Sequence, residues 1–168
     1  MKQLILIRHA KSDWSHNGIR DIDRSLNQRG NHDAPRMAEH FSKVFHPEIW
    51  YVSPALRAQQ TAAYFLNKQQ QHHITSITEQ ALYSFDLNTV IQLITQFDNK
   101  YVSAALVYHN PTISETAHYF CNHFTEQVPT CAVVVLSFSV DQWQHLSADT
   151  AELSTYDYPK RHDWAFKS

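Results

Sequence analysis

Short apolar runs that alternate with helical patterns are the feature that most constrains the fold of this chain. The first run, Leu4-Ile5-Leu6-Ile7, is followed directly by Arg8 and His9. Continuous runs of this kind are typical of strands buried on both faces, as in parallel sheets covered by helices. The sequence predicts five strands, over residues 3–8, 49–52, 74–77, 102–108 and 132–140.

Helical periodicity occupies the segments between these strands. Apolar residues recur at helical spacing over residues 34–45, 87–97 and 113–124, and a further helix is expected over about residues 54–67. This alternation predicts an α/β protein, a three-layer α/β/α sandwich with a mostly parallel central sheet. A length of 168 residues suits a single domain over residues 1–168, ending in a polar tail from about residue 147 to 168.

Two expected helix starts place a polar residue before a proline, as Ser53-Pro54 and Asn110-Pro111. Serine and asparagine are good N-caps, and proline is favoured at the first helical position. Free backbone N–H groups at such helix starts attract anions. An anion-binding site is therefore expected where the strands end.

Composition argues against several classes of partner. The net charge of −2 gives no electrostatic footprint for nucleic acid, and no run of like charge suggests a membrane surface. The first apolar run is too short for a signal peptide or a membrane span, so a cytoplasmic location is expected. Cys121 and Cys131 are too few for a disulfide framework and are expected to be reduced, buried thiols.

No cofactor or metal is expected from the sequence motifs. His118 and His123 are five residues apart, which places them on different faces of a helix, and no H-E-x-x-H or C-x-x-C occurs. With only Gly18 and Gly30, the chain cannot build a glycine-rich phosphate loop. A bound phosphate would have to be held by side chains and helix ends.

Arg8, His9, Arg57 and His109 all lie near the junction of an expected strand with the following segment. If these strand ends are neighbours, four nitrogen-bearing side chains with no acid among them converge on one pocket, which suits a multiply charged phosphoryl group. A neutral imidazole can also be the nucleophile in a phosphoryl transfer that proceeds by two displacements. Neighbouring guanidinium groups would keep that imidazole neutral.

The segments Arg8-His9-Ala10, 53–61 and 109–111 resemble the three signatures of the histidine phosphatase superfamily, whose fold is phosphoglycerate mutase-like. Residues 8–14 and 23–30 are similar to the SixA-like phosphohistidine phosphatases, and the resemblance extends to about residue 146. It implies that His9 accepts the phosphoryl group and that Arg8, Arg57 and His109 hold its oxygens. Ser15 falls where relatives often have a further phosphate contact.

Three positions depart from the family pattern, with Ala10, Tyr108 and Thr112 standing where members commonly carry glycine. The ring of Tyr108 is expected to narrow the pocket or to offer a stacking surface, which affects substrate choice. Relatives that cleave alkyl phosphates use a glutamate as general acid, and Glu79, or less plausibly Asp86, is the candidate here. By residue type, Glu79 also fits a solvated surface charge, and Asp86 fits the N-cap of the next helix.

Phosphohistidine on a protein is the expected substrate. Its leaving imidazole can take a proton from solvent, whereas an alkoxide needs a placed acid. Only 51 residues separate Arg57 from His109, which leaves no room for an insertion that would enclose a small molecule. Two alternatives stay open: a small-molecule phosphomonoesterase or mutase of the same fold, and a non-catalytic phosphate-binding or docking module.

Overall fold

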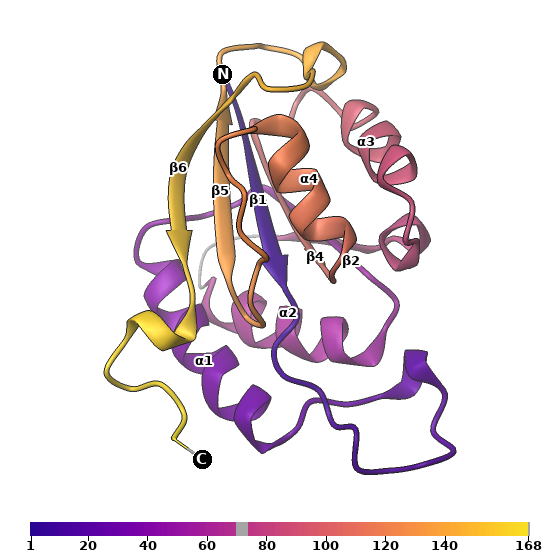
Figure 1. Cartoon of the computed structure of the whole chain (residues 1–168). Helices are drawn as coiled ribbons and strands as arrows, with labels where there is room; N and C mark the ends of the chain where they lie inside the picture. The colour runs from indigo at the N-terminus through magenta and orange to yellow at the C-terminus, as the bar shows by residue number, and fades with distance from the viewer. Residues whose placement is uncertain (70–73, 168) are drawn as a thin grey trace.

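A six-stranded sheet forms the middle layer of the computed structural model, which describes residues 1–69 and 74–167 (Figure 1). The strand order is β3-β2-β4-β1-β5-β6. The strands β1 to β4 are parallel, β5 runs antiparallel to its two neighbours β1 and β6, and β6 therefore has the same direction as β1. The predicted α/β class with a mostly parallel sheet is confirmed. The bounds are Lys2–Arg8 for β1, Ile49–Val52 for β2, Thr75–Thr78 for β3, Ser103–Tyr108 for β4, Val133–Phe138 for β5 and Ala151–Asp157 for β6.

Helices cover both faces of this sheet. The bounds are Gln28–Ser42 for α1, Leu56–Lys68 for α2, Leu87–Thr95 for α3 and Thr112–Phe120 for α4, and the short 3-10 helices are η1 (Asp21–Asp23), η2 (Gln80–Tyr83), η3 (Trp143–His145) and η4 (Pro159–Arg161). On β1, Ile5 and Ile7 pack toward α1 and α2, whereas Leu4 and Leu6 pack toward α3 and α4. All four are fully buried, which explains why this strand is apolar at successive positions.

The C-terminal segment is more ordered than its composition suggests. Residues expected to form a polar tail include the edge strand β6, which pairs with β5. Its middle residues are exposed, so it lacks the apolar pattern by which a buried strand is found. Tyr156 and Tyr158 pack against the core beneath α3 and α4, and Trp164 packs against the core beneath α1 and α2. These aromatic side chains hold the segment to the body of the protein.

The predicted helix caps at Ser53 and Asn110 are wrong. The N-caps of α2 and α4 are Ala55 and Pro111, and neither makes a side-chain capping bond. The Asn110 amide instead donates to the carbonyl of Val128, 3.0 Å away, and so ties two loops together. The helix starts still follow the strand ends closely, which is what places the site.

Cys121 and Cys131 are free and buried, as expected. Within residues 1–69 and 74–167, no helix combines the length and apolarity needed to cross a bilayer.

Gly30 allows the segment that follows β1 to lie against the first turn of α1. The Asn27 side chain caps the helix by accepting from the Gly30 N–H at 2.9 Å. The Asn27 N–H in turn donates to the carbonyl of Lys11 at 3.0 Å. A Cβ atom at Gly30 would overlap that carbonyl oxygen. Glycine is required here by this close approach of two backbones.

Replacing Gly30 with alanine is therefore expected to destabilise the protein. Helix propensity alone favours alanine by about 1 kcal/mol. The overlap with the Lys11 backbone outweighs this, so the free energy of unfolding should fall by about 1–3 kcal/mol in urea denaturation. Gln28→Ala, at an exposed position of the same turn, is the control and should change it by less than about 0.5 kcal/mol. A Gly30→Ala protein as stable as the wild type would contradict this packing.

Candidate active site

Three neighbouring parallel strands bring the predicted residues together. His9 follows β1, Arg57 lies in the first turn of α2 after β2, and His109 follows β4 (Figure 1). Since β2, β4 and β1 are adjacent in the sheet, their carboxyl ends share one edge. The Arg57 Nε lies 3.3 Å from the Nε2 of His9, and the His9 and His109 ring centroids are 6.3 Å apart.

His9 is held as a neutral imidazole with one nitrogen directed at the site. Its Nδ1 lies 2.7 Å from the carbonyl of Ala10, so Nδ1 carries the proton and donates it there. Burial lowers the pKa of His9 to about 3; the bond to Ala10 opposes this shift, and the charges of Arg57 and Arg8 reinforce it. At neutral pH, Nε2 is therefore unprotonated, and its lone pair accepts a hydrogen bond from the Nε of Arg57.

His109 offers two ring nitrogens to the same space. Burial lowers its pKa to about 4, with a further contribution from the charge of Arg57. Among the described residues, neither of its ring nitrogens has a hydrogen-bond partner. The ring stacks on Phe85, with centroids 5.5 Å apart. A buried polar group of this kind normally has a partner, so His109 is well suited to donate to an oxygen of a ligand.

Arg8 completes the ring of basic groups. Its Nη1 donates to the carbonyl of Val128 at 2.8 Å, which fixes the guanidinium at the end of β1. Its Nε is buried and has no partner in the part of the chain that the structure describes. Burial lowers the pKa of Arg8, but a guanidinium stays charged in proteins. Arg8 therefore adds positive charge and a free donor to the site.

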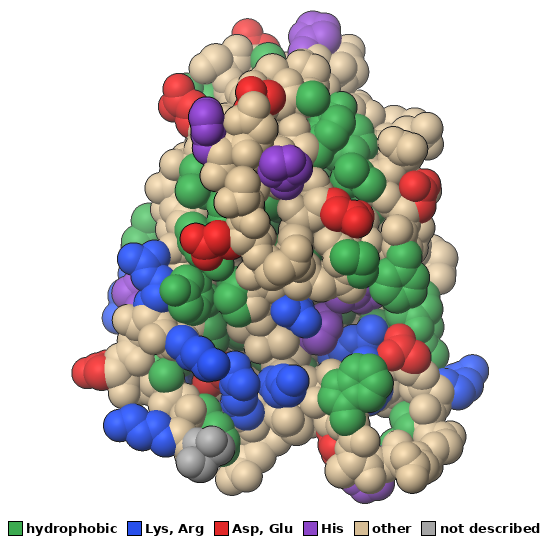
Figure 2. Space-filling model, in the orientation of Figure 1, with side chains coloured by type: hydrophobic (Ala, Val, Ile, Leu, Met, Phe, Trp, Pro, Cys, Tyr) green, Lys and Arg blue, Asp and Glu red, His purple; other side chains and the backbone are tan. Residues whose placement is uncertain are grey.

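These groups line a cavity of about 380 Å³. Figure 2 shows Lys and Arg side chains gathered on the lower half of this face, near the end of β1, with histidine side chains visible between them. Besides Arg8, His9, Arg57 and His109, the lining residues are Lys11, Ser12, Trp14, Asp21, Arg24, Tyr83, Phe85, Asn110 and Thr130. The cavity is thus strongly basic, with aromatic side chains at its margin.

Asp21 is an acid that lines the cavity and that no sequence motif indicated. Its carboxylate accepts from Tyr83 Oη at 2.7 Å, Arg24 Nη2 at 2.8 Å and Arg57 Nη2 at 3.1 Å. Partial burial would raise the pKa of Asp21, but the bonds from Arg24 and Tyr83 and the charge of Arg57 hold it well below its ordinary value. Asp21 is therefore ionised and cannot supply a proton near neutral pH.

Two sets of bonds fix the direction of Arg57. Its Nη1 donates to the carbonyl of Asp21 at 2.8 Å, while its Nη2 meets the carboxylate of the same residue. At the other end, the Thr61 hydroxyl donates to the carbonyl of Arg57 at 2.7 Å and accepts from the Ala10 N–H at 2.9 Å. The first turn of α2 and the segment after β1 are thereby tied together. As a result, the Nε of Arg57 points at His9.

Comparison with known proteins assigns this arrangement to a family. The model of the histidine phosphatase superfamily (branch 1) matches residues 4–118. The chain belongs to the histidine phosphatase superfamily. It is accordingly an enzyme, a phosphatase, and the site just described is the candidate active site of this phosphatase.

Relatives of the phosphatase include both sequences and structures. The uncharacterised protein ML1117 of Mycobacterium leprae is 30% identical over 92% of this chain and 100% of its own. A protein assigned as the phosphohistidine phosphatase SixA of Agrobacterium tumefaciens is 25% identical, with a TM-score of 0.81 over 94% of this chain and 98% of its own. A SixA structure from Nakamurella multipartitia is 21% identical, with a TM-score of 0.77 over 94% and 96%. The phosphatase therefore has a SixA-like fold.

Two residues singled out in the sequence lie away from the cavity of the phosphatase. The Ser15 hydroxyl donates to the carboxylate of Asp13 at 2.6 Å, and Ser15 is not among the lining residues. Tyr108 is fully buried in the core under α3 and α4, so its ring neither narrows the pocket nor offers a stacking surface there. The serine that lines the cavity is Ser12, whose hydroxyl accepts from Arg24.

The two candidate acids both cap helices. The Glu79 carboxylate accepts from the Ala81 N–H at 3.0 Å and caps η2. Asp86 is the N-cap of α3, as its alternative interpretation predicted, and accepts from the backbone of Asn88 and Thr89. Hydrogen bonds from Thr89 lower the pKa of Asp86. Neither carboxylate lines the cavity, and an acid role for Glu79 stays a prediction.

Asp21→Asn is expected to lower kcat/KM by about tenfold to a hundredfold. The reason is that Arg57 would be displaced, and small displacements of a side chain in an active site lower the rate by about this factor. The amide keeps one acceptor but loses the charge that holds Arg57 and Arg24. Steady-state kinetics with a phosphohistidine peptide measure the change.

Asp23→Asn is the matched control for this variant. It lies in the same short helix, but its carboxylate pairs with Arg20. Its kcat/KM should stay within about twofold of the wild type, since an exposed ion pair contributes little. Equal kinetics for the two variants would show that Asp21 does not position Arg57.

Proposed function

We propose that this phosphatase removes phosphoryl groups through a covalent phosphohistidine at His9, and that its substrate is phosphohistidine on another protein. The observation that carries the proposal is the state of His9. Its Nδ1 proton is engaged by Ala10, and its Nε2 lone pair faces the cavity beside Arg57. A buried neutral imidazole in this position is a ready nucleophile.

In the first displacement, the His9 Nε2 lone pair forms a bond to phosphorus. The bond from phosphorus to the leaving nitrogen breaks, and its electron pair stays with the leaving imidazole. Arg8 and Arg57 neutralise the charge on the phosphoryl oxygens, and a ring N–H of His109 donates to one of them. The side chains that meet at the strand ends thus each have a defined part in the transfer.

In the second displacement, water attacks the phosphorus of phosphorylated His9. The bond from phosphorus to Nε2 breaks, its electron pair returns to the imidazole, and phosphate leaves after the attacking water has lost a proton to solvent. The same basic groups stabilise this transition state, because the charge again lies on the phosphoryl oxygens. The enzyme then returns to the neutral His9 with which it began.

The chemistry of the leaving group favours phosphohistidine over alkyl phosphates. Asp21 lies in the cavity but is held ionised, and Glu79 and Asp86 are occupied as helix caps. A leaving imidazole needs none of them, because it takes a proton from solvent at its other nitrogen. An alkoxide leaves slowly without a placed acid.

The margin of the cavity supports a protein substrate. Trp14 and Phe85 line the cavity while 71% and 65% of their surface stays exposed. Large exposed aromatic side chains are enriched where proteins bind partners. The relative from Agrobacterium tumefaciens, which is assigned as a phosphohistidine phosphatase, agrees with this substrate class.

A panel of phosphohistidine peptide, phosphoserine peptide and sugar phosphate, compared by kcat/KM, tests the substrate. The phosphohistidine peptide should be preferred by at least about a hundredfold, because it alone needs no acid. His9→Ala should lose at least about a thousandfold with every substrate, since the nucleophile is gone. Quenching with an alkaline denaturant during turnover should trap a phosphoenzyme in the wild type, stable in alkali and lost on acidification, and none in His9→Ala.

Glu79→Gln separates the proposal from its small-molecule alternative. The amide can still cap η2, so folding should be preserved. Phosphohistidine hydrolysis should then stay within about twofold of the wild type, because no acid is required. Fast turnover of sugar phosphates that Glu79→Gln abolishes would instead establish a phosphomonoesterase with Glu79 as its acid.

A further inference from the structure

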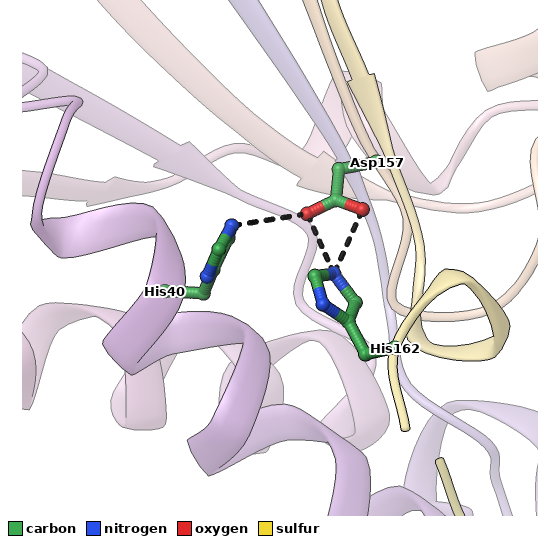
Figure 3. A group of neighbouring side chains, drawn as sticks. All are labelled: His40, Asp157 and His162. Carbon is green, nitrogen blue, oxygen red and sulfur yellow. Dashed lines mark hydrogen bonds and ion pairs between the residues drawn. The ribbon is translucent and has the colours of Figure 1, made fainter. Parts of the chain in front are cut away.

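A second cluster of polar side chains lies beside α1, away from the phosphate cavity. His40 belongs to the last turn of α1, Asp157 is the last residue of β6, and His162 follows η4 (Figure 3). None of the three lines the candidate active site. Because these residues come from three segments, only the folded chain brings them together.

The ligand atoms of the cluster face one another. The His162 Nε2 lies 2.9 Å from both carboxylate oxygens of Asp157, and the His40 Nε2 lies 3.7 Å from one of them. One ligand atom from each residue lies within 4.8 Å of the others. Figure 3 shows both imidazoles directed at the same carboxylate, and their ring centroids lie 4.8 Å apart.

A simple hydrogen-bonded pair accounts for only part of this arrangement. His162 and Asp157 satisfy one another without a third group. The His40 Nε2, at 3.7 Å, is too far from the carboxylate for a hydrogen bond, yet it faces the same oxygen that His162 uses. Two imidazole nitrogens converging on one carboxylate form a set of ligands for a cation.

The distances between the ligand atoms, and their chemical types, indicate which cation would fit. Zinc binds nitrogen and oxygen at about 2.0–2.2 Å, so tetrahedral ligand atoms lie about 3.3 Å apart. The observed separations of 2.9 and 3.7 Å lie on either side of this value. Imidazole and carboxylate suit zinc and its neighbours, whereas calcium and magnesium prefer oxygen ligands. We propose that His40, Asp157 and His162 bind a divalent transition-metal ion of the zinc type.

Neighbouring contacts hold the ligands in place. The His162 ring stacks on Trp164, with centroids 4.8 Å apart and an angle of 11° between the planes. The His40 side chain is 54% exposed, so solvent can supply the fourth ligand.

Such an ion would fasten the C-terminal segment to α1. Asp157 and His162 belong to the last part of the chain, and His40 belongs to the helix against which that part lies (Figure 1). An ion that binds only the folded arrangement stabilises it by mass action. The sequence predicted no metal because motif searches rely on short spacings, which His40 and His162 do not have.

Calorimetric titration with zinc chloride tests the site directly. The wild type should bind one equivalent at the cluster, and His40→Gln, Asp157→Asn and His162→Gln should each weaken that binding by at least about tenfold. Zinc should also raise the Tm of the wild type but not that of these variants. His123→Gln, at an exposed histidine outside the cluster, is the matched control and should bind as the wild type does.

His40→Gln is the decisive variant, because His40 is half-exposed on α1 and its replacement leaves the pair of Asp157 and His162 intact. Zinc binding by His40→Gln as tight as that of the wild type would overturn the proposal. His72 and His73 lie outside the described residues and are removed together in a second control. That double variant should retain the site, and loss of all zinc binding in it would equally refute the proposal.

Discussion

The burial of one uncharged imidazole against a guanidinium is the interaction on which the proposed reaction depends. Arg57 donates to the Nε2 of His9, and burial together with the surrounding positive charge keeps that ring neutral. A charged ring could neither accept this bond nor attack phosphorus. Asp21 and Thr61 serve the same interaction, because they fix the guanidinium from which the bond is donated. The charge of Asp21 also balances part of the positive charge that Arg24 and Arg57 bring to the cavity.

The sheet topology makes this interaction possible. Residues widely separated in sequence meet because β2, β4 and β1 are parallel neighbours and each ends at the same edge. The strands are covered on both faces, which anchors that edge in two apolar cores. The site is therefore carried by rigid elements, while its margin is formed by the segments around η1 and η2. The sheet therefore fixes the geometry of the site, whereas the residues of the surrounding segments, which would contact the substrate, can vary without disturbing that geometry.

Hydrophobic periodicity was sufficient to predict the mostly parallel sheet and its strand ends. The meeting of Arg8, His9, Arg57 and His109 was predicted on the condition that these strand ends are neighbours, and the family resemblance supported it. The sequence was not sufficient for Asp21, which lies in an irregular segment and reaches the cavity only through tertiary contacts. The strand β6 was missed because it is an exposed edge strand, and the capping roles predicted for Ser53 and Asn110 failed because loop contacts decided those positions. Local patterns thus predicted the core of the site, whereas its supporting residues required the fold.

The protonation state of His9 tests the central claim most directly. In nitrogen-15 NMR of the folded enzyme, a pH titration should find the His9 ring neutral from pH 8 down to about pH 4, with its proton on Nδ1. The midpoint of its protonation should lie at a pH of about 3. Burial disfavours the charged ring, so the midpoint must lie below the ordinary value of 6.5. A His9 ring that becomes an imidazolium with a midpoint near 6.5, or one that carries its proton on Nε2 at neutral pH, would contradict the account.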